Sequence, residues 1–331
     1  MRIIFFLSIF LIELCRAQIT DTTFAEKLGY PGGSKVLILH VDDAGMSSDS
    51  NEGAIEAITK GAATSCSVMM PCPWVPGFVR YLKQHPEIDA GLHLTLTSEW
   101  QDYRWAPLAC KESVPGLTDK EGDLWPSVED VVKHASADEV ETEILAQLQR
   151  ADNMGFVPTH LDSHMGTLFA SPDFLQRYIK VGIEKHIPVM LPGGQDVLIR
   201  QQTHAPDAMI KQMQGIGKIL WAAGLPVLDD LHNFSYDWKI PDAIANDDKK
   251  LQAFKTAKYI EAIKLLLPGI TMMIMHCTKT TEVFPYISSS GAVRKGDLLA
   301  MTDPAFKAAL KKEGIIVTTW RELTQRRNNI H

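Results

Sequence analysis

Acidic and imidazole side chains gather at the ends of four apolar runs of this sequence. In chain order, the four groups are His40 with Asp42 and Asp43, then His93, then His160 with Asp162 and His164, and finally His276. These groups hold five of the eleven histidines in the chain. Imidazole and carboxylate together suit a borderline divalent ion such as Zn, Co, Ni or Mn. We therefore expect a metal site and a hydrolytic reaction that uses it.

Two adjacent aspartates, Asp42 and Asp43, end the first run. Neighbouring carboxylates repel, and each makes the other harder to ionise unless a cation is close. The alternative is that they cap the helix expected over residues 51–60. Residues 47–50 already offer Ser and Asp side chains nearer to that helix, which weakens this alternative. We predict that Asp43 is a metal ligand and that Asp42, free beside it, is the general base.

Two histidines lie at separate strand ends. His93 alternates with leucines over residues 91–97, so it lies on the polar face of its strand. His276 follows the apolar run 270–275 and would lie at the exit of that strand. His93 could instead be a core histidine satisfied by one hydrogen bond, and His276 could be packed under a loop. With Asp43 on a nearby strand, we predict that His93 binds the metal and that a protonated His276 is the general acid.

His160, Asp162 and His164 are spaced by two residues, which places all three on one face of a strand. A carboxylate beside a metal-bound histidine commonly orients that histidine. A solvated hairpin strand is the alternative, although the apolar lead-in argues against it. The spacing leaves open which histidine binds. We favour His164, at the loop end, and keep His160 and Asp162 as outer or alternative ligands.

These residues fill every role in amide hydrolysis. Asp43, His93 and His164 would hold one divalent ion (Zn, Co, Ni, Mn or Mg) and leave room for water and a substrate carbonyl. Asp42 would remove the water proton, and His276 would protonate the leaving amine. We therefore predict a metal-dependent hydrolase that cleaves an amide C–N bond.

The elements that must position these residues alternate along the chain. The runs expected to form strands are residues 36–40, 63–70, 88–96, 156–161, 187–191, 225–228, 270–275 and 315–319. The helical patterns cover residues 51–60, 76–84, 137–154, 172–184, 207–222, 248–266 and 304–312. About eight strands alternating with helices predict an α/β fold, a distorted (β/α) barrel of the TIM type with mostly parallel strands. An open, doubly wound sheet is the alternative.

Two long segments, 97–136 and 231–247, are expected to be loop insertions over one face of a single domain. They are rich in aromatic residues, and their tryptophans are Trp100, Trp105, Trp125 and Trp238. Indole rings stack on the apolar faces of sugars. We expect these four rings to stack on the sugar rings of an oligosaccharide, and we assign Trp105, Trp125 and Trp238 as substrate-binding residues.

The composition and the N-terminal residues limit which partners and which location we expect. The chain has 331 residues and a net charge of -7, which gives no basic face for nucleic acid or an anionic membrane. Arg2 followed by the apolar run 3–12, too short to span a bilayer comfortably, predicts a secretory signal peptide over residues 1–17. Cleavage after Ala17 would leave residues 18–331 as the barrel domain. We expect a secreted or periplasmic protein with no membrane span after cleavage.

The four cysteines outside that signal match no zinc-binding spacing; they are Cys66, Cys72, Cys110 and Cys277. Cys72 and Cys110 fall in expected loops, and an exported protein could pair them. Spacing alone cannot supply the geometry that a disulfide needs. The pairing is therefore one alternative, with all four thiols free as the other.

Three stretches of this chain resemble the landmarks of a known family. HVDDAGMSSDSNEGAIEA, GLHLTLT and HLDSHMG begin at His40, Gly91 and His160. Their order and rough spacing resemble the YdjC-like (ChbG) carbohydrate deacetylases, and the resemblance runs from about Val36 to His276. It implies a distorted barrel, one divalent metal and the deacetylation of N-acetylglucosamine-containing oligosaccharides. A homodimer is common among such proteins.

Carried over residue by residue, the resemblance implies the same ligands and the same base. Asp43, His93 and His164 match the metal ligands of the family, and Asp42 matches its base. Two positions depart from the family pattern. The family usually has a His-Pro pair at the position of His276, whereas this chain has His276-Cys277-Thr278, and the arginine expected near Met190 is missing.

Two other functions remain open at this point. The same metal site could cleave an ester or another small amide. Alternatively, the chain could be a secreted carbohydrate-binding protein with a degenerate site. That second interpretation predicts missing ligands, and none of the three primary ligands is missing.

Overall fold

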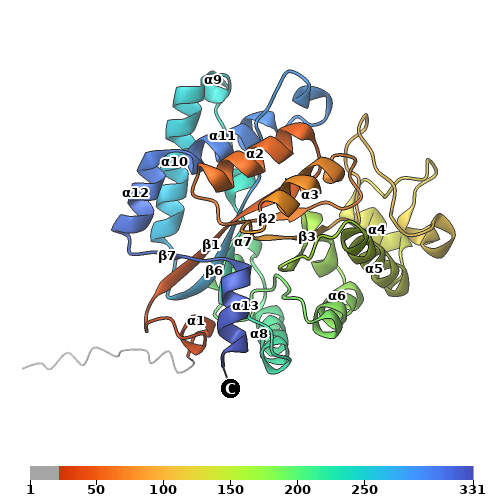
Figure 1. The fold of residues 1–331 in the computed structure, drawn as a ribbon, viewed down its shortest axis with the longest axis horizontal. Coiled ribbons are helices and arrows are strands. Elements are labelled where there is room, and N and C mark those ends of the chain that lie inside the picture. The colour runs from red at the N-terminus through yellow and green to blue at the C-terminus, as the bar shows by residue number, and fades with distance from the viewer. Residues whose placement is uncertain (1–21, 331) are drawn as a thin grey trace, which may run out of the picture.

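One long strand, β1 (Lys35–Ala44), runs through the middle of a parallel sheet in the computed structural model, which describes residues 22–330. Every residue of β1 after Lys35 is buried. A strand covered on both faces should read as a continuous apolar run, as this one does until its polar end. β1 pairs with β2 (Ser65–Val68) on one side and with β6 (Gly269–Met275) on the other (Figure 1).

The sheet order is β4-β3-β2-β1-β6-β5, with the short β7 beside β1. The remaining strands are β3 (Ala90–Leu94), β4 (Leu161–Ser163), β5 (Asp230–His232) and β7 (Ile316–Val317). All the paired strands are parallel, so their C-terminal ends lie at one edge of the sheet. That edge carries the acidic and imidazole groups.

The segment between residues 188 and 193 links the two outer strands of the sheet. Isolated parallel bridges pair Val189 with Leu161 and Pro192 with Leu228. Pro188 and Pro192 have no N–H to donate, so no continuous ladder forms here. The predicted α/β fold, a distorted barrel of mostly parallel strands, is confirmed. The strands predicted over 187–191 and 225–228 exist only as these bridges.

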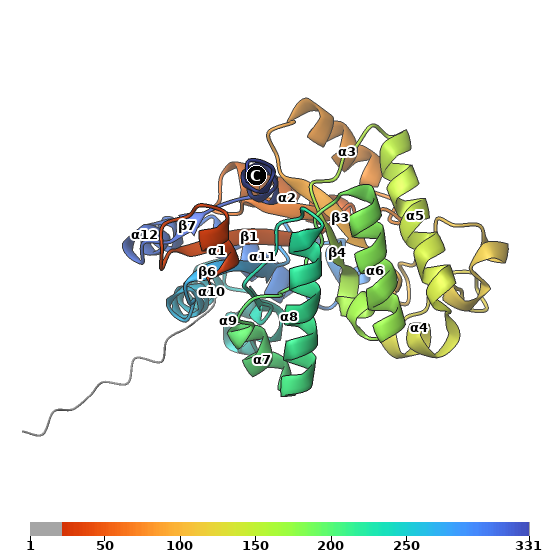
Figure 2. The ribbon, with the colours of Figure 1, turned by 90° about the horizontal axis from the view of Figure 1, so that it is seen from below.

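Helices cover the outside of the curled sheet (Figure 2). They are α1 (Phe24–Lys27), α2 (Ser48–Thr59), α3 (Val75–Gln84), α4 (Val128–His134), α5 (Ala137–Asn153), α6 (Pro172–Lys185), α7 (Val197–Thr203), α8 (Asp207–Ala222), α9 (Asp242–Ala245), α10 (Asp248–Lys264), α11 (Gly291–Met301), α12 (Pro304–Lys312) and α13 (Trp320–Asn328). The helices predicted over 207–222 and 304–312 are α8 and α12, and both have the predicted bounds. The Ser136–Glu139 capping box begins α5, as expected.

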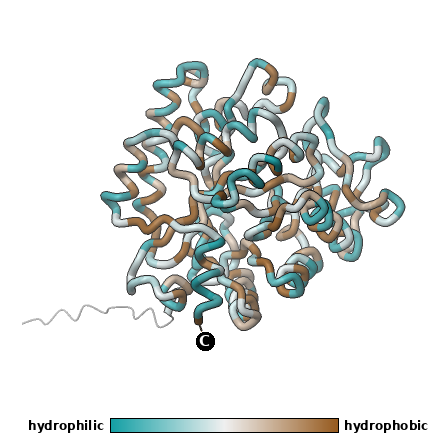
Figure 3. The backbone as a smooth tube through the Cα atoms, in the orientation of Figure 1, coloured by the Kyte–Doolittle hydropathy of each residue, from teal (hydrophilic) through white to brown (hydrophobic). Residues whose placement is uncertain are grey.

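The last helix, α13, is hydrophilic along most of its length (Figure 3) and buries only Trp320 and Leu323. No helix within residues 22–330 is both long and apolar enough to cross a membrane. The predicted signal peptide, 1–17, and its cut after Ala17 lie outside the described residues. The domain boundary at residue 18 therefore stays a prediction.

The insertion 97–136 is not a plain loop. It contains α4 and two short 3-10 turns, Lys111–Ser113 and Pro115–Leu117 (yellow in Figure 1). Cys72 is buried and Cys110 is exposed, and both thiols are free. The disulfide between them that the sequence left open is not formed.

Candidate metal centre

A bend at the end of β1 brings two neighbouring carboxylates into one cavity. On a regular strand Asp42 and Asp43 would face opposite sides. Asp43 instead has a left-handed φ of 67°, and the pairing with β2 shifts between Val41 and Ala44. Aspartate tolerates this conformation better than most residues. Gly45 follows with φ 87°, where a Cβ would also lie 2.6 Å from the Val75 side chain.

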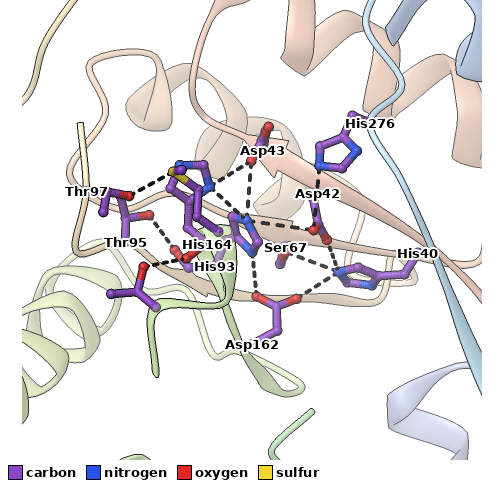
Figure 4. Close-up of polar contacts among 12 residues, drawn as sticks. His40, Asp42, Asp43, Ser67, His93, Thr95, Thr97, Asp162, His164 and His276 are labelled. Carbon is purple, nitrogen blue, oxygen red and sulfur yellow. Dashed lines mark hydrogen bonds and ion pairs between the residues drawn. The ribbon is translucent and has the colours of Figure 1, made fainter. Parts of the chain in front are cut away.

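Three ligand atoms form a nearly equilateral triangle (Figure 4). Asp43 Oδ1 lies 3.3 Å from His93 Nε2 and 3.4 Å from His164 Nδ1, and the two nitrogens are 3.3 Å apart. Tetrahedral coordination with bonds of about 2.0 to 2.1 Å separates ligand atoms by about 3.3 Å. Asp43 Oδ1 is buried and has no hydrogen-bond partner. The residues present therefore fit one divalent ion.

Each histidine of the triangle has a carboxylate on its other ring nitrogen. His93 Nδ1–H donates to Asp162 Oδ1 at 2.7 Å, and His164 Nε2–H donates to the two Glu99 oxygens at 3.2 and 3.1 Å. These bonds assign the tautomer that leaves a lone pair pointing into the triangle. Asp162 is thus an orienting group for His93. Glu99, in an insertion without periodicity, had no sequence signal.

Arg294 of α11 fixes the other oxygen of Asp43. Its Nη1 donates to Asp43 Oδ2 at 2.6 Å, and only 3% of the residue is exposed. Burial alone would raise the pKa of Asp43, but Arg294 and the two histidines outweigh it and hold that pKa well below its usual value. Asp43 therefore stays ionised over the working pH range. Sequence reasoning missed Arg294, which lies 251 residues after its partner.

His40 lies beneath the triangle and bridges two carboxylates. Its Nε2 is 2.9 Å from Asp162 Oδ2 and 3.2 Å from Asp42 Oδ1. Burial lowers the pKa of His40, but the two aspartates outweigh it and raise that pKa to about 9. A protonated His40 thus ties Asp42 to the carboxylate that orients His93.

The other histidine of the third motif, His160, points away from the triangle. Its ring stacks on Trp320 at 5.2 Å, and its Nδ1 lies 3.0 Å from the Thr159 hydroxyl. Its Nε2 is 3.6 Å from Asp162 Oδ2. The structure therefore brings His164, rather than His160, into the ligand triangle.

His276 faces Asp42 across the cavity mouth. Its Nε2 lies 3.9 Å from Asp42 Oδ2, and its backbone N–H donates to Asp297 Oδ2 at 3.0 Å. The Tyr236 ring lies 4.9 Å from the imidazole. Burial lowers the pKa of His276, which favours the neutral imidazole, so His276 must gain a proton before it can give one to a leaving group. This placement suits a proton donor to a leaving group.

A cavity of about 550 Å³ opens over the triangle and includes Asp42, Asp43, His93, His164 and His276 in its lining. The three tryptophans predicted to contact sugar do not line it. Trp105 is 3% exposed and donates to Thr97 O, Trp125 stacks on His134, and Trp238 packs on Tyr259. These rings are held by their own surroundings, so the geometry does not support them as stacking platforms.

Trp100, the fourth tryptophan expected to stack on sugar, does line the cavity, and so does Tyr236, which had no expected contact. Both rings lie near the Arg294 guanidinium, at 6.0 and 5.5 Å from its central carbon. They come from the two insertions that the sequence placed over one face of the barrel. The insertions thus reach the site through Trp100 and Tyr236.

Known proteins resemble this chain over most of its length. A carbohydrate deacetylase from Thermus thermophilus is 30% identical over 300 residues, which cover 91% of this chain and 97% of that protein. A chitooligosaccharide deacetylase from Yersinia enterocolitica is 32% identical over 133 residues, which cover 39% of this chain and 49% of that protein.

A solved structure shares the fold. The crystal structure of a putative cellobiose-phosphate cleavage protein from Enterococcus faecalis V583 superposes with a TM-score of 0.69 at 19% identity, covering 88% of this chain and 99% of that one. The family model described as YdjC-like protein matches residues 36–312, a span that contains every residue of the triangle. The chain therefore belongs to the YdjC-like protein family.

Proposed function

We propose that this protein is a metal-dependent hydrolase that removes the acetyl group from N-acetylated sugars of an oligosaccharide. The Asp43–His93–His164 triangle, with Asp42 and His276 beside it, carries the proposal. The names of the relatives, carbohydrate deacetylase and chitooligosaccharide deacetylase, support the substrate class.

The roles of the residues follow from their positions. A divalent ion at the triangle would polarise the amide carbonyl and make water more acidic. Asp42 accepts the proton of the attacking water, and His40 holds the Asp42 carboxylate in place. His276 gives its proton to the nitrogen as the C–N bond breaks. Arg294 keeps Asp43 ionised throughout.

Acetate release from diacetylchitobiose tests the reaction. The protein is stripped with a chelator and then reconstituted with Zn, Co, Ni, Mn or Mg in turn. We expect release only from the reconstituted protein, and the rates identify the preferred ion. A protein that holds one ion per chain and releases no acetate with any of the five would contradict the proposal.

Asp42→Asn tests the base. We expect this variant to keep its ion and to lose about 10² to 10⁴-fold in kcat, because the water proton has no acceptor. Asp173→Asn, an exposed aspartate on α6, is the matched control and should leave kcat unchanged. A rate for Asp42→Asn within a few-fold of the parent rate would remove Asp42 from its role.

We also propose where the protein acts and how it assembles. We propose export to the periplasm or the medium, supported by the N-terminal sequence, and N-terminal sequencing of the mature protein should find Gln18 first. Assembly as a homodimer rests on the family resemblance. Light scattering of the mature chain distinguishes a dimer from a monomer.

A further inference from the structure

Helix α11 contacts both the ligand triangle and the proposed proton donor. Its Arg294 donates to Asp43 Oδ2 at 2.6 Å. Three residues later, Asp297 Oδ2 accepts the backbone N–H of His276 at 3.0 Å. Residues three apart lie on the same face of a helix. One face of α11 therefore sets the spacing between these two parts of the site.

The imidazole of His276 is not fixed by a hydrogen bond of its own (Figure 4). Within residues 22–330, its buried Nδ1 has no hydrogen-bond partner. Its Nε2 is 3.9 Å from Asp42 Oδ2, which is beyond hydrogen-bond distance. The Tyr236 ring packs against the imidazole in a T-shaped contact at 4.9 Å. The position of the imidazole therefore depends largely on the backbone of His276.

That backbone lies immediately after β6, which ends one residue before His276. Asp297 supplies an acceptor for its N–H at the point where the strand ends. The next residue is Cys277, so no proline ring restricts the turn. Thr278 N–H donates to the Arg294 carbonyl oxygen at 3.3 Å, which is a second bond from this turn to α11. Helix α11 thus holds the backbone that carries the imidazole.

Asp297 is itself held on both sides. The residue is fully buried, and its Oδ1 accepts from the Tyr259 hydroxyl and lies 2.7 Å from Lys255 Nζ. An ionised acceptor makes a hydrogen bond about twice as strong as a neutral one. The cavity lining includes His276 but neither Asp297 nor Lys255. Asp297 can therefore reach the reaction only through His276.

We infer that Asp297 is a positioning residue: through the backbone N–H of His276, it holds the proton donor at a fixed place over the ligand triangle. The inference rests on the proposed amide hydrolysis with His276 as the acid. Asp297 touches neither the substrate nor the ion. Its loss should therefore lower kcat and leave KM and the metal content unchanged. A displacement of about 1 Å in a reacting group costs about 100-fold in rate, which bounds the effect.

A double-mutant cycle on acetate release from diacetylchitobiose tests the inference. A single amide oxygen in Asp297→Asn cannot serve His276 and the Lys255 side at once. We expect Asp297→Asn to lower kcat by about 10- to 100-fold in the parent protein. In the His276→Ala background, the same substitution should change kcat by less than about twofold, because the group that it positions is gone. Equal losses in both backgrounds, or no loss in the parent, would overturn the inference.

A second variant guards against misfolding of the first. Lys255→Met with Asp297→Leu removes both charges together, so neither remains buried alone. This variant also leaves the His276 N–H without its acceptor. We expect one ion per chain and the same loss of kcat as in Asp297→Asn. A folded double variant with the parent kcat would show that the bond to His276 is not needed.

Asp303→Asn is the matched control. The Asp303 carboxylate accepts from the Ala305 N–H and the Thr256 hydroxyl, both at 2.8 Å, and does not line the cavity. We expect this variant to be less stable in urea and to keep the parent kcat. A loss of kcat equal to that of Asp297→Asn would attribute both effects to general destabilisation. A parent protein that releases no acetate contradicts the proposed function, whereas an active parent with an additive cycle contradicts the inference alone.

Discussion

Two buried charged clusters lie near the C-terminal end of β6 and differ in how completely they are paired. Between α10 and α11, Lys255 and Asp297 are both fully buried, with Nζ 2.7 Å from Oδ1. Lys255 also donates to Ser235 O, and Asp297 accepts from the Tyr259 hydroxyl and from the His276 N–H. Neither side chain has an unpaired buried atom.

The cluster on the cavity side is incomplete. Asp43 Oδ1 and His276 Nδ1 are buried without a hydrogen-bond partner. Native proteins rarely leave buried polar atoms unpaired, and the exceptions concentrate where a ligand or an ion binds. Complete pairing is therefore typical of a structural cluster such as that of Lys255, whereas the unpaired atoms of the Asp43 cluster are free to bind an ion.

Asp43→Asn should have the largest effect, because it removes the charge at the centre of the incomplete cluster. We expect the metal content to fall from one ion per chain to near zero, and kcat/KM to fall by at least about 10³-fold. Elemental analysis after dialysis measures the metal content, and release of the free amine measures kcat/KM. A variant that retained one ion per chain would show that Asp43 is not needed to bind the ion.

Lys255→Met tests the complete cluster. The substitution leaves Asp297 buried and uncompensated, so we expect a loss of about 3 to 5 kcal/mol in the free energy of unfolding, measured in urea. The metal content should stay at one ion per chain. Adding Asp297→Leu should recover part of the loss, since no unpaired charge then remains. Loss of the ion in Lys255→Met would show that the two clusters are coupled.

Asp196 gives a third case, a buried acid with no partner on either oxygen. Burial, then Asp230 and Asp229, raises its pKa to about 7. The folded state therefore binds the proton more tightly than the unfolded chain, whose pKa is about 3.9. Its contribution to stability is complete below about pH 4 and is lost as pH rises toward 7.

Asp196→Asn should abolish that dependence. Between pH 5 and pH 8, we expect the variant to gain on the order of 2 to 3 kcal/mol relative to the parent protein. Urea unfolding at the two pH values measures the difference, and groups that titrate in both proteins cancel. If the free energies of unfolding of the two proteins changed equally between pH 5 and pH 8, Asp196 would have a partner in solution.

Glu99→Ala should have the smallest effect, since Glu99 only orients a ligand. We expect metal affinity to weaken by about 10 to 100-fold, because His164 loses the acceptor that fixes its tautomer. Glu99→Gln keeps an acceptor, so its metal affinity should lie between those of Glu99→Ala and the parent protein. Glu112→Ala, exposed in the same insertion, is the control. Equal affinities for all four proteins would remove Glu99 from the site.

The parts of this structure that follow a local rule were predictable from the sequence. Strand alternation and the aspartate pair were enough to favour Asp43, His93 and His164, and caps were enough to place the starts of α5 and α12. The site residues that depend on distant contacts gave no local signal. Glu99 lies in an insertion without periodicity, and Arg294 meets Asp43 only through tertiary packing.

Helix α11, which carries Arg294, escaped prediction for a physical reason. It begins at Gly291 and contains Gly296, and glycine is a poor helix former. A Cβ at Gly296 would lie 2.7 Å from the Lys255 side chain, so close packing against α10 requires glycine there. Tertiary packing thus overrides local propensity in this helix. The same packing explains why its buried arginine could not be read from the sequence.

The closure of the barrel through single bridges has a mechanical consequence. Around most of its circumference the barrel is stiff, because β4, β3, β2, β1, β6 and β5 are joined by parallel hydrogen-bonded pairs. At the 188–192 segment, only isolated bonds resist separation, so this sector is the most compliant part of the sheet. Local opening should begin there. Asp43 thus lies on the most fully paired strand of the sheet, whereas Met190, which also lines the cavity, lies in its least bonded segment. We expect the cavity to widen or narrow at Met190 with little movement of Asp43.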